Sequence, residues 1–144
     1  MKNTISDIQK FKNNISPFSI ITVYDYPTAL IVNDTDIPMV LVGDSASMVV
    51  YGYNNTMPIT MEELIFLVRA VNRACNKSLI VADMPFMSYQ ITVEDAIWNA
   101  GILVKEAGAH AVKLEGGILV AETVRRIVST GIPVMGHIGL TPQS

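Results

Sequence analysis

Five short apolar runs recur along the chain. They are FSIITV (18–23), MVLVG (39–43), LIVAD (79–83), AVKLE (111–115) and PVMGHIG (133–139). Near-continuous aliphatic runs of this length are typical of parallel β-strands, because both faces of a parallel sheet are covered. We therefore expect five buried parallel strands.

Helical periodicity fills the intervals between these runs. Apolar residues spaced as on one face of a helix form three stripes: Leu64, Leu67, Val68 and Val71; Ile97, Gly101 and Val104; and Val120, Val124, Ile127 and Val128. Thr60 with Glu63 predicts a capping box, and Thr92 predicts a second helix start. Gly108 and Gly131 stand where helices should end. The predicted order is strand then helix, repeated.

This alternation leaves two main folds, an open doubly wound sheet or a (β/α)₈ barrel. No G-x-G-x-x-G follows the first strand, so the usual dinucleotide-binding signature is missing and the barrel is favoured. A complete barrel takes about 250 residues and eight strands, whereas these 144 residues provide five strands. We expect residues 1–144 to form a single, incomplete TIM-barrel domain of about the first five βα units.

Composition excludes several classes of protein. Half of the residues are hydrophobic, 16% are charged, and the formal net charge is −3. This balance gives no electrostatic basis for binding nucleic acid or an anionic membrane surface. The polar start is unlike a signal peptide, and no apolar run approaches the length of a membrane span. The single Cys75 suggests a small buried residue in a reducing compartment, so we expect a cytoplasmic protein.

Polar side chains stand at the C-terminal end of every predicted strand. They are Tyr24 and Asp25, Asp44 and Ser45, Asp83, Lys113 and Glu115, and His137. In parallel α/β folds, the loops that follow the strands share one rim, which carries the chemistry. A helix cap, a turn or a structural hydrogen bond would explain any one of these residues alone. Their occurrence at all five strand ends favours a functional site.

Asp44, Asp83 and Glu115 are three carboxylates predicted to face one mouth, where mutual repulsion would raise their pKa values unless a cation lay among them. With oxygen ligands and no Cys or His cluster, Mg²⁺ is preferred over Zn²⁺. Lys113 shares a strand face with Glu115, so it would add a positive charge beside the metal. An anionic 2-oxo acid could bind to both, because the metal and the lysine would together stabilise the enolate formed by deprotonation next to the carbonyl. The alternative for Lys113 and Glu115 is a solvated ion pair on a half-exposed strand.

Several stretches at these positions closely resemble the ketopantoate (3-methyl-2-oxobutanoate) hydroxymethyltransferase family, over nearly the whole chain. They are TVYDYP, LVGDSASMVVYGY, MPIT, VADMPFMSYQ, AGAHAVKLEGG and GIPVMGHIGLTPQS. The resemblance implies a barrel of the phosphoenolpyruvate mutase/isocitrate lyase superfamily. It implies transfer of a hydroxymethyl group from 5,10-methylenetetrahydrofolate to 3-methyl-2-oxobutanoate, giving 2-dehydropantoate on the route to pantothenate and coenzyme A. It also implies a homo-oligomer, a decamer in the family, for the full-length protein.

The resemblance also implies roles for individual residues. Asp44 and Asp83 would bind Mg²⁺ directly, and Glu115 would belong to the same metal site, directly or through water. The oxo acid would be contacted by Asp44, Ser45, Asp83 and Lys113. His137, in the segment GHIGLTPQ, would have a supporting role on the substrate or folate side.

Two departures from the family pattern stand out. Ala46 and Ser47 replace a usual Leu-Gly pair, and a serine would strain the backbone only if that position needs positive φ. The family chain also continues for roughly another hundred residues, as the size of a barrel requires, and its glutamate base lies in that part. We therefore assign no general base before residue 144 and expect the 144-residue chain alone to be inactive.

Two alternative hypotheses remain from the sequence. One is another enzyme of the same superfamily, a C–C lyase acting on a different 2-oxo acid. The other is a non-catalytic fragment or a truncated gene model. We expect this hypothesis to hold over activity of the chain alone, because the sequence stops just after the fifth predicted strand of an eight-stranded barrel.

Overall fold

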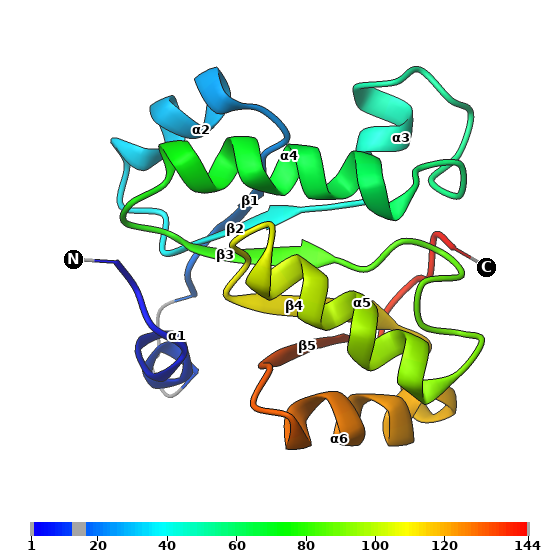
Figure 1. Cartoon of the computed structure of the whole chain (residues 1–144). Helices are drawn as coiled ribbons and strands as arrows, with labels where there is room; N and C mark the ends of the chain where they lie inside the picture. The colour runs from blue at the N-terminus through cyan, green and yellow to red at the C-terminus, as the bar shows by residue number, and fades with distance from the viewer. Residues whose placement is uncertain (1, 13–16, 144) are drawn as a thin grey trace.

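The structure is a computed structural model that describes residues 2–12 and 17–143. Its elements in chain order are α1 (Ile5–Phe11), β1 (Ile20–Thr22), α2 (Tyr26–Asn33), β2 (Met39–Val42), α3 (Ala46–Val49), α4 (Met61–Ala74), β3 (Leu79–Asp83), α5 (Val93–Lys105), β4 (Ala111–Glu115), the 3₁₀ helix η1 (Gly117–Val120), α6 (Ala121–Ser129) and β5 (Val134–His137) (Figure 1). Each of the five predicted strands is confirmed within its apolar run.

The five strands form one parallel sheet in the order β1-β2-β3-β4-β5. Each connection moves one strand further in the same direction, and right-handed crossovers of that kind place their helices on one face (Figure 1). A doubly wound sheet would reverse direction at a switch point, and the described strands show no reversal. The sheet is therefore a singly wound arc of a TIM barrel, as predicted.

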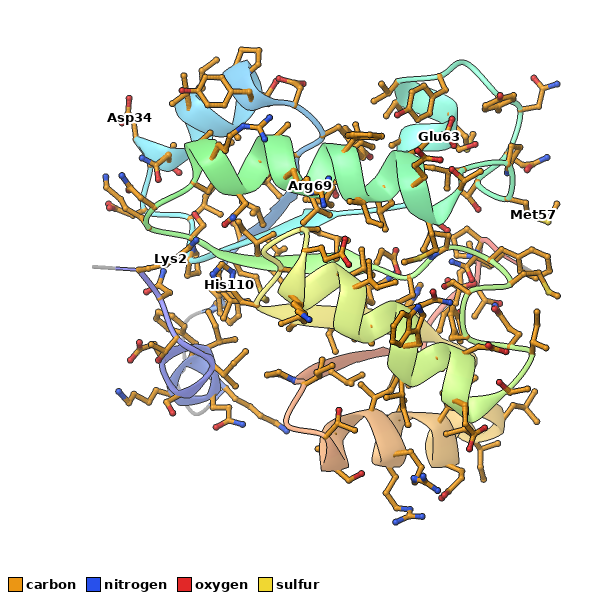
Figure 2. The ribbon with its side chains drawn as sticks, viewed as in Figure 1. Lys2, Asp34, Met57, Glu63, Arg69 and His110 are labelled. Atoms are coloured by element: carbon orange, nitrogen blue, oxygen red, sulfur yellow. The ribbon has the colours of Figure 1, made fainter. Side chains whose placement is uncertain are left out.

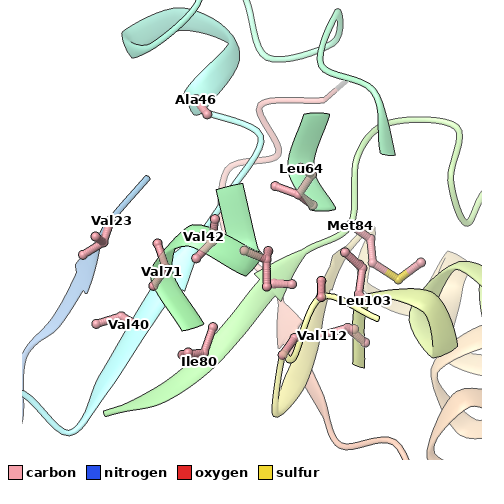
Figure 3. Packing of buried hydrophobic residues seen from close by; sticks show 14 of the residues in the cluster. Val23, Val40, Val42, Ala46, Leu64, Val71, Ile80, Met84, Leu103 and Val112 are labelled. Atoms are coloured by element: carbon pink, nitrogen blue, oxygen red, sulfur yellow. The ribbon is translucent and has the colours of Figure 1, made fainter. Parts of the chain in front are cut away.

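Side chains alternate between the two faces of this arc. The outer face contributes Val40, Val42, Ile80 and Val112 to the main core, where Leu64 and Val71 of α4 and Leu103 of α5 cover them (Figure 3). The inner face carries a smaller cluster of Met39, Leu79, Val81 and Ala111, packed by Ile5 and Ile8 of α1. Continuing the alternation from Ala111, Lys113 and Glu115 belong to the inner face.

The predicted helix signals are largely confirmed. Thr60 and Glu63 form a reciprocal capping box at the start of α4, and the Thr92 side chain accepts from the backbone N–H of Asp95. In α5, however, the buried residues are Ala96, Ala100 and Leu103. The buried face of α5 therefore lies one position before the predicted stripe, whose Ile97 and Val104 flank the core.

The two edge strands are more exposed than predicted. Ile20 and Ile21 of β1 are 45% and 39% exposed, because β1 pairs only with β2 among the described residues. Beyond the other edge, the loops around β5 expose Ile138 and Leu140 almost completely. The expectation of buried strands is therefore wrong for β1 and also for β5, in which no residue is fully buried. Apolar side chains along both edges are what five strands of an eight-stranded barrel leave uncovered.

Cys75 is buried, as predicted, and its thiol donates a hydrogen bond to the Ala29 carbonyl oxygen at 3.7 Å. Burial raises the pKa of this thiol, which keeps it in the unreactive neutral form. None of the helices in residues 2–12 and 17–143 is both long and apolar enough to cross a membrane.

Gly108 and Gly131 follow α5 and α6 with φ of +85° and +90°. A Cβ at Gly108 would lie 2.2 Å from Asn72 Nδ2, whereas a Cβ at Gly131 would meet nothing within 4 Å. We expect Gly131→Ala to lower the free energy of unfolding by about 1 kcal/mol, the cost of the left-handed backbone alone. Gly108→Ala should cost clearly more, because Asn72 must also move. Urea denaturation of both variants measures the difference, and equal losses would mean that the Asn72 side chain moves away at little cost.

Candidate active site

The carboxyl ends of the strands bring the predicted polar residues to one rim. Asp44 follows β2 directly, Asp83 ends β3, and Glu115 ends β4. The register of the sheet places Asp83 beside Lys113 and Glu115 beside His137. Four strands therefore contribute side chains to the same end of the sheet.

Lys113 and Asp83 form a buried ion pair in which Lys113 Nζ lies 2.5 Å from Asp83 Oδ2. Asp83 is 4% exposed, Lys113 is 9% exposed and Glu115 is 5% exposed. The alternative of a solvated Lys113–Glu115 pair is therefore wrong, because β4 is covered on both faces and the ion-pair partner of Lys113 lies across the register on β3. The side chains of Lys113 and Glu115 therefore lie on the inner face of the sheet.

Asp83 lies in a site that is short of positive charge. Burial raises the pKa of its carboxyl to about 7; Lys113 opposes the rise, while Asp44 and Glu115 add to it. The second oxygen of this carboxyl, Oδ1, is buried and has no hydrogen-bond partner in the described part of the chain. A buried carboxylate oxygen without a partner is costly, so this oxygen is suited to bind a cation.

Gln143 is a site residue that the sequence analysis missed. Its backbone N–H donates to Glu115 Oε1 at 2.9 Å, and its side-chain amide donates to Asp44 Oδ2 at 2.8 Å and to the Met84 carbonyl oxygen at 3.0 Å. The hydroxyl of Tyr89 donates to Gln143 Oε1 at 2.8 Å. Both residues lie in segments quoted for the family resemblance, but no periodicity or spacing rule distinguishes a loop glutamine or tyrosine.

His137 stands at the rim beside Glu115. Its Nδ1 lies 3.3 Å from Glu115 Oε2, within ion-pair distance but without hydrogen-bond geometry. A cavity of about 590 Å³ opens here, and its lining includes Phe86, Tyr89, Glu115, His137, Ile138 and Gln143. Asp44, Asp83 and Lys113 do not line this cavity, although Gln143 lines it and contacts Asp44.

The other histidine, His110, is separate from this rim. It precedes β4 and lies near Lys2 (Figure 2). Its Nδ1 accepts a hydrogen bond from the backbone N–H of Ile80 at 3.0 Å, and burial lowers its pKa. His110 is therefore a neutral structural residue at the amino end of the sheet.

The remaining rim residues divide into two kinds. The Tyr24 hydroxyl and Ser45 Oγ share a hydrogen bond of 2.7 Å, which brings Ser45 into the network beside Asp44. The Asp25 carboxylate instead accepts from the backbone N–H of Thr28 at 2.7 Å and caps α2. Asp25 is thus explained as the cap of α2, and its position after β1 does not indicate a catalytic or binding role.

Ser47, one of the departures from the family pattern, fits without strain. It lies inside α3, and Met87 is the non-glycine residue with positive φ in the described chain. Ser47 is buried, and its hydroxyl donates to the Asn55 carbonyl oxygen at 2.8 Å. The buried hydroxyl of Ser47 therefore has a hydrogen-bond partner, and the helical backbone at this position accepts a serine.

The three predicted metal ligands approach one another without forming a compact cluster. Among residues 2–12 and 17–143, no group of three or more His, Cys, Asp or Glu side chains could by itself hold a metal ion. Asp44 and Glu115 are nevertheless near enough to influence Asp83. Direct binding of Mg²⁺ by Asp44 and Asp83, with Glu115 bound directly or through one water, stays a prediction. The unpartnered Oδ1 of Asp83 is consistent with it.

A singly wound parallel sheet with charged residues at its carboxyl rim defines a protein of the (β/α)-barrel fold class. The fold is that of a solved 2,3-dimethylmalate lyase, a PEP mutase/isocitrate lyase superfamily member, with TM-score 0.68, 14% identity, and 94% of this chain and 51% of that chain covered. A solved oxaloacetate acetylhydrolase has TM-score 0.67 and 13% identity, with 93% of this chain and 52% of that chain covered. At these identities, the likeness shows the fold alone.

The family model described as Ketopantoate hydroxymethyltransferase matches residues 2–144. The chain belongs to the ketopantoate hydroxymethyltransferase family.

Curated relatives named 3-methyl-2-oxobutanoate hydroxymethyltransferase support this assignment. One from Dehalococcoides mccartyi is 55% identical over 144 residues, which are 100% of this chain and 52% of the relative. One from Clostridium botulinum is 53% identical over 144 residues, again 100% of this chain and 52% of the relative. One from Geobacter metallireducens is 56% identical over 143 residues, 99% of this chain and 54% of the relative. The chain spans about half the length of the curated relatives it matches.

Proposed function

We propose that this chain supplies the Mg²⁺-binding and oxo-acid-binding half of a 3-methyl-2-oxobutanoate hydroxymethyltransferase. In the reaction, the methylene carbon of 5,10-methylenetetrahydrofolate and one water become the hydroxymethyl group added to 3-methyl-2-oxobutanoate, and the products are 2-dehydropantoate and tetrahydrofolate. One observation carries the proposal: the buried Lys113–Asp83 pair at the carboxyl ends of β4 and β3, which leaves one carboxylate oxygen without a partner. The names of relatives 53% to 56% identical support the choice of reaction.

Lys113 is the residue that we assign to the anion of the oxo acid. A lysine ammonium has three N–H donors, and Lys113 uses one of them on Asp83. The remaining donors can bind the substrate carboxylate. Because Lys113 is only 9% exposed, little water competes for this charge, and the electrostatic attraction is stronger than it would be on the surface.

Asp44 and Asp83 are the carboxylates that we assign as direct Mg²⁺ ligands, with Glu115 bound directly or through one water. When bound, the ion would polarise the carbonyl of the oxo acid and stabilise the enolate that forms on proton removal. Ser45, held by Tyr24, would offer its hydroxyl to the substrate next to Asp44. These residues hold and orient the oxo acid in a water-poor site.

The folate co-substrate is assigned to the cavity beside this site. A volume of about 590 Å³ lies within the usual range for small-molecule pockets, about 300–1,000 Å³. Phe86 and Ile138 would contact a flat ring system, while Glu115 and His137 provide polar groups. His137 therefore has a supporting role on the folate side. We assign the general base to the half of the relatives that this chain does not match.

The family resemblance also supports two proposals about the whole protein. It would act in the cytoplasm, and it would assemble as a homo-oligomer, a decamer in the family. Light scattering of the chimera described next, coupled to size-exclusion chromatography, tests the assembly.

A chimera tests the proposed function. In it, this chain replaces the matching 144 residues of the Dehalococcoides mccartyi relative, and the unaltered relative is the positive control. We expect the chimera to form 2-dehydropantoate only with folate, oxo acid and Mg²⁺, and the 144-residue chain alone to form none. Folate-independent C–C bond cleavage would favour a superfamily lyase. A folded chimera that catalyses neither reaction would favour a non-catalytic role for this chain.

A further inference from the structure

Gln143 connects the carboxyl ends of three neighbouring strands. It is 4% exposed, and it donates to Asp44 after β2, to the backbone of Met84 after β3, and to Glu115 at the end of β4. One oxygen of each carboxylate, Asp44 Oδ2 and Glu115 Oε1, is therefore bound to Gln143. The rotations of both carboxylates are restrained. The second oxygen of Glu115, Oε2, lies 3.3 Å from His137 Nδ1.

The orientation of the Gln143 amide is itself fixed. The Met84 carbonyl oxygen can only accept, so the atom facing it must be Nε2, and Oε1 must face the Tyr89 hydroxyl. The backbone N–H of Glu115 donates to that hydroxyl at 3.3 Å. The single hydroxyl proton has two acceptors in reach, the Glu115 carbonyl oxygen at 3.2 Å and the nearer Gln143 Oε1 at 2.8 Å. With the proton on the nearer contact, hydrogen bonds run from Glu115 through Tyr89 and Gln143 to Asp44. Such directional networks polarise and strengthen their members.

We propose that Gln143 is a positioning residue for the metal site, and that Tyr89 holds it in place. Gln143 would not touch the cation; it would hold one oxygen each of Asp44 and Glu115, so that both carboxylates stay fixed beside Asp83. This inference rests on the proposed function, because that proposal assigns the carboxylates as ligands. Residues that orient metal ligands typically change metal affinity by about 10- to 100-fold when they are replaced.

The test is the affinity of the chimera for Mn²⁺, measured by electron paramagnetic resonance without substrate. Gln143→Leu keeps the bulk of the side chain and removes its hydrogen bonds, and we expect Mn²⁺ to bind about 10- to 100-fold more weakly. Tyr89→Phe should cause a smaller loss in the same direction, since the amide remains but is no longer held. Because both variants break one network, the double variant should lose little more than Gln143→Leu alone.

A core variant separates positioning from general destabilisation. Leu103 is buried in α5, and Leu103→Ala should lower the melting temperature while Mn²⁺ affinity stays at the wild-type value. If Gln143→Leu does not fold, the same comparison is made with Tyr89→Phe. Unchanged Mn²⁺ affinity in folded Gln143→Leu and Tyr89→Phe, beside a wild type that binds, would overturn the positioning role and leave the proposed function intact. A wild-type chimera that binds no Mn²⁺ would overturn both.

Discussion

Replacing Asp83 with asparagine in the chimera is expected to reduce hydroxymethyl transfer by about 1,000-fold or more. Loss of a ligand that neutralises and orients a catalytic cation removes several kcal/mol of transition-state stabilisation, and each 1.36 kcal/mol is about tenfold in rate. Turnover and Mn²⁺ affinity should fall together. A variant that keeps wild-type Mn²⁺ affinity would contradict the assignment of Asp83 as a ligand.

Asp25→Asn is the matched control for Asp83→Asn. Both aspartates follow or end strands at the same rim, but Asp25 caps α2 through the backbone N–H of Thr28. Asparagine caps helices about as well as aspartate, so we expect Asp25→Asn to keep its activity within a few fold. Equal losses in the two variants would mean that the rim is sensitive to any change of charge.

The raised pKa of Asp83 also predicts how stability depends on pH. Without a divalent cation, the folded state keeps the proton of Asp83 up to about pH 7, whereas the unfolded chain releases it near its ordinary pKa of about 4. The native state therefore binds more protons between these values, and the contribution of Asp83 to stability falls as pH rises through this window. Wild-type chimera should lose stability more steeply from pH 5 to 7.5 than Asp83→Asn. Saturating Mg²⁺ should reduce the difference, because the cation favours the ionised carboxylate.

The sequence predicted the features that depend on local periodicity. LIVAD and AVKLE match β3 and β4 residue for residue, because strands covered on both faces are mostly aliphatic and their charged residues stand only toward the carboxyl end. The capping box of Thr60 and Glu63 was also predictable, since both partners lie within one turn. α2 was not predicted: Leu30 and Ile31 are exposed while Ala29 and Val32 are buried, so its buried face cannot be recognised from apolar positions alone.

The site was predicted as a set of residues but not as a network. The rule that strand ends meet at one rim brought Asp44, Asp83 and Lys113 together without any knowledge of strand register. The partner of Lys113 depends on that register, which pairs it with Asp83 rather than with its near neighbour Glu115. Gln143 lies on a loop whose path depends on tertiary packing, so no pattern in the sequence could indicate its hydrogen bonds.

Lys113→Met is expected to weaken binding of 3-methyl-2-oxobutanoate to the Mg²⁺-loaded chimera by about 30-fold or more. Removing one partner of a buried, hydrogen-bonded charge pair typically costs about 2–5 kcal/mol, and 1.4 kcal/mol is about tenfold in affinity. Methionine keeps much of the apolar length of the lysine stem, so packing between β3 and β4 changes little. Isothermal titration with the oxo acid at saturating Mg²⁺ measures the effect, and exposed Lys105→Met is the matched control.

The affinity for Mg²⁺ itself should respond differently in Lys113→Met. Loss of a positive charge beside Asp83 makes the carboxylates a stronger site for a cation, so Mg²⁺ should bind at least as tightly as in the wild type. Weaker binding of the oxo acid without weaker binding of Mg²⁺ would place Lys113 on the substrate side of the site. Unchanged affinity for the oxo acid would instead leave Lys113 as a structural counter-ion of Asp83, and the anion of the substrate would need another partner.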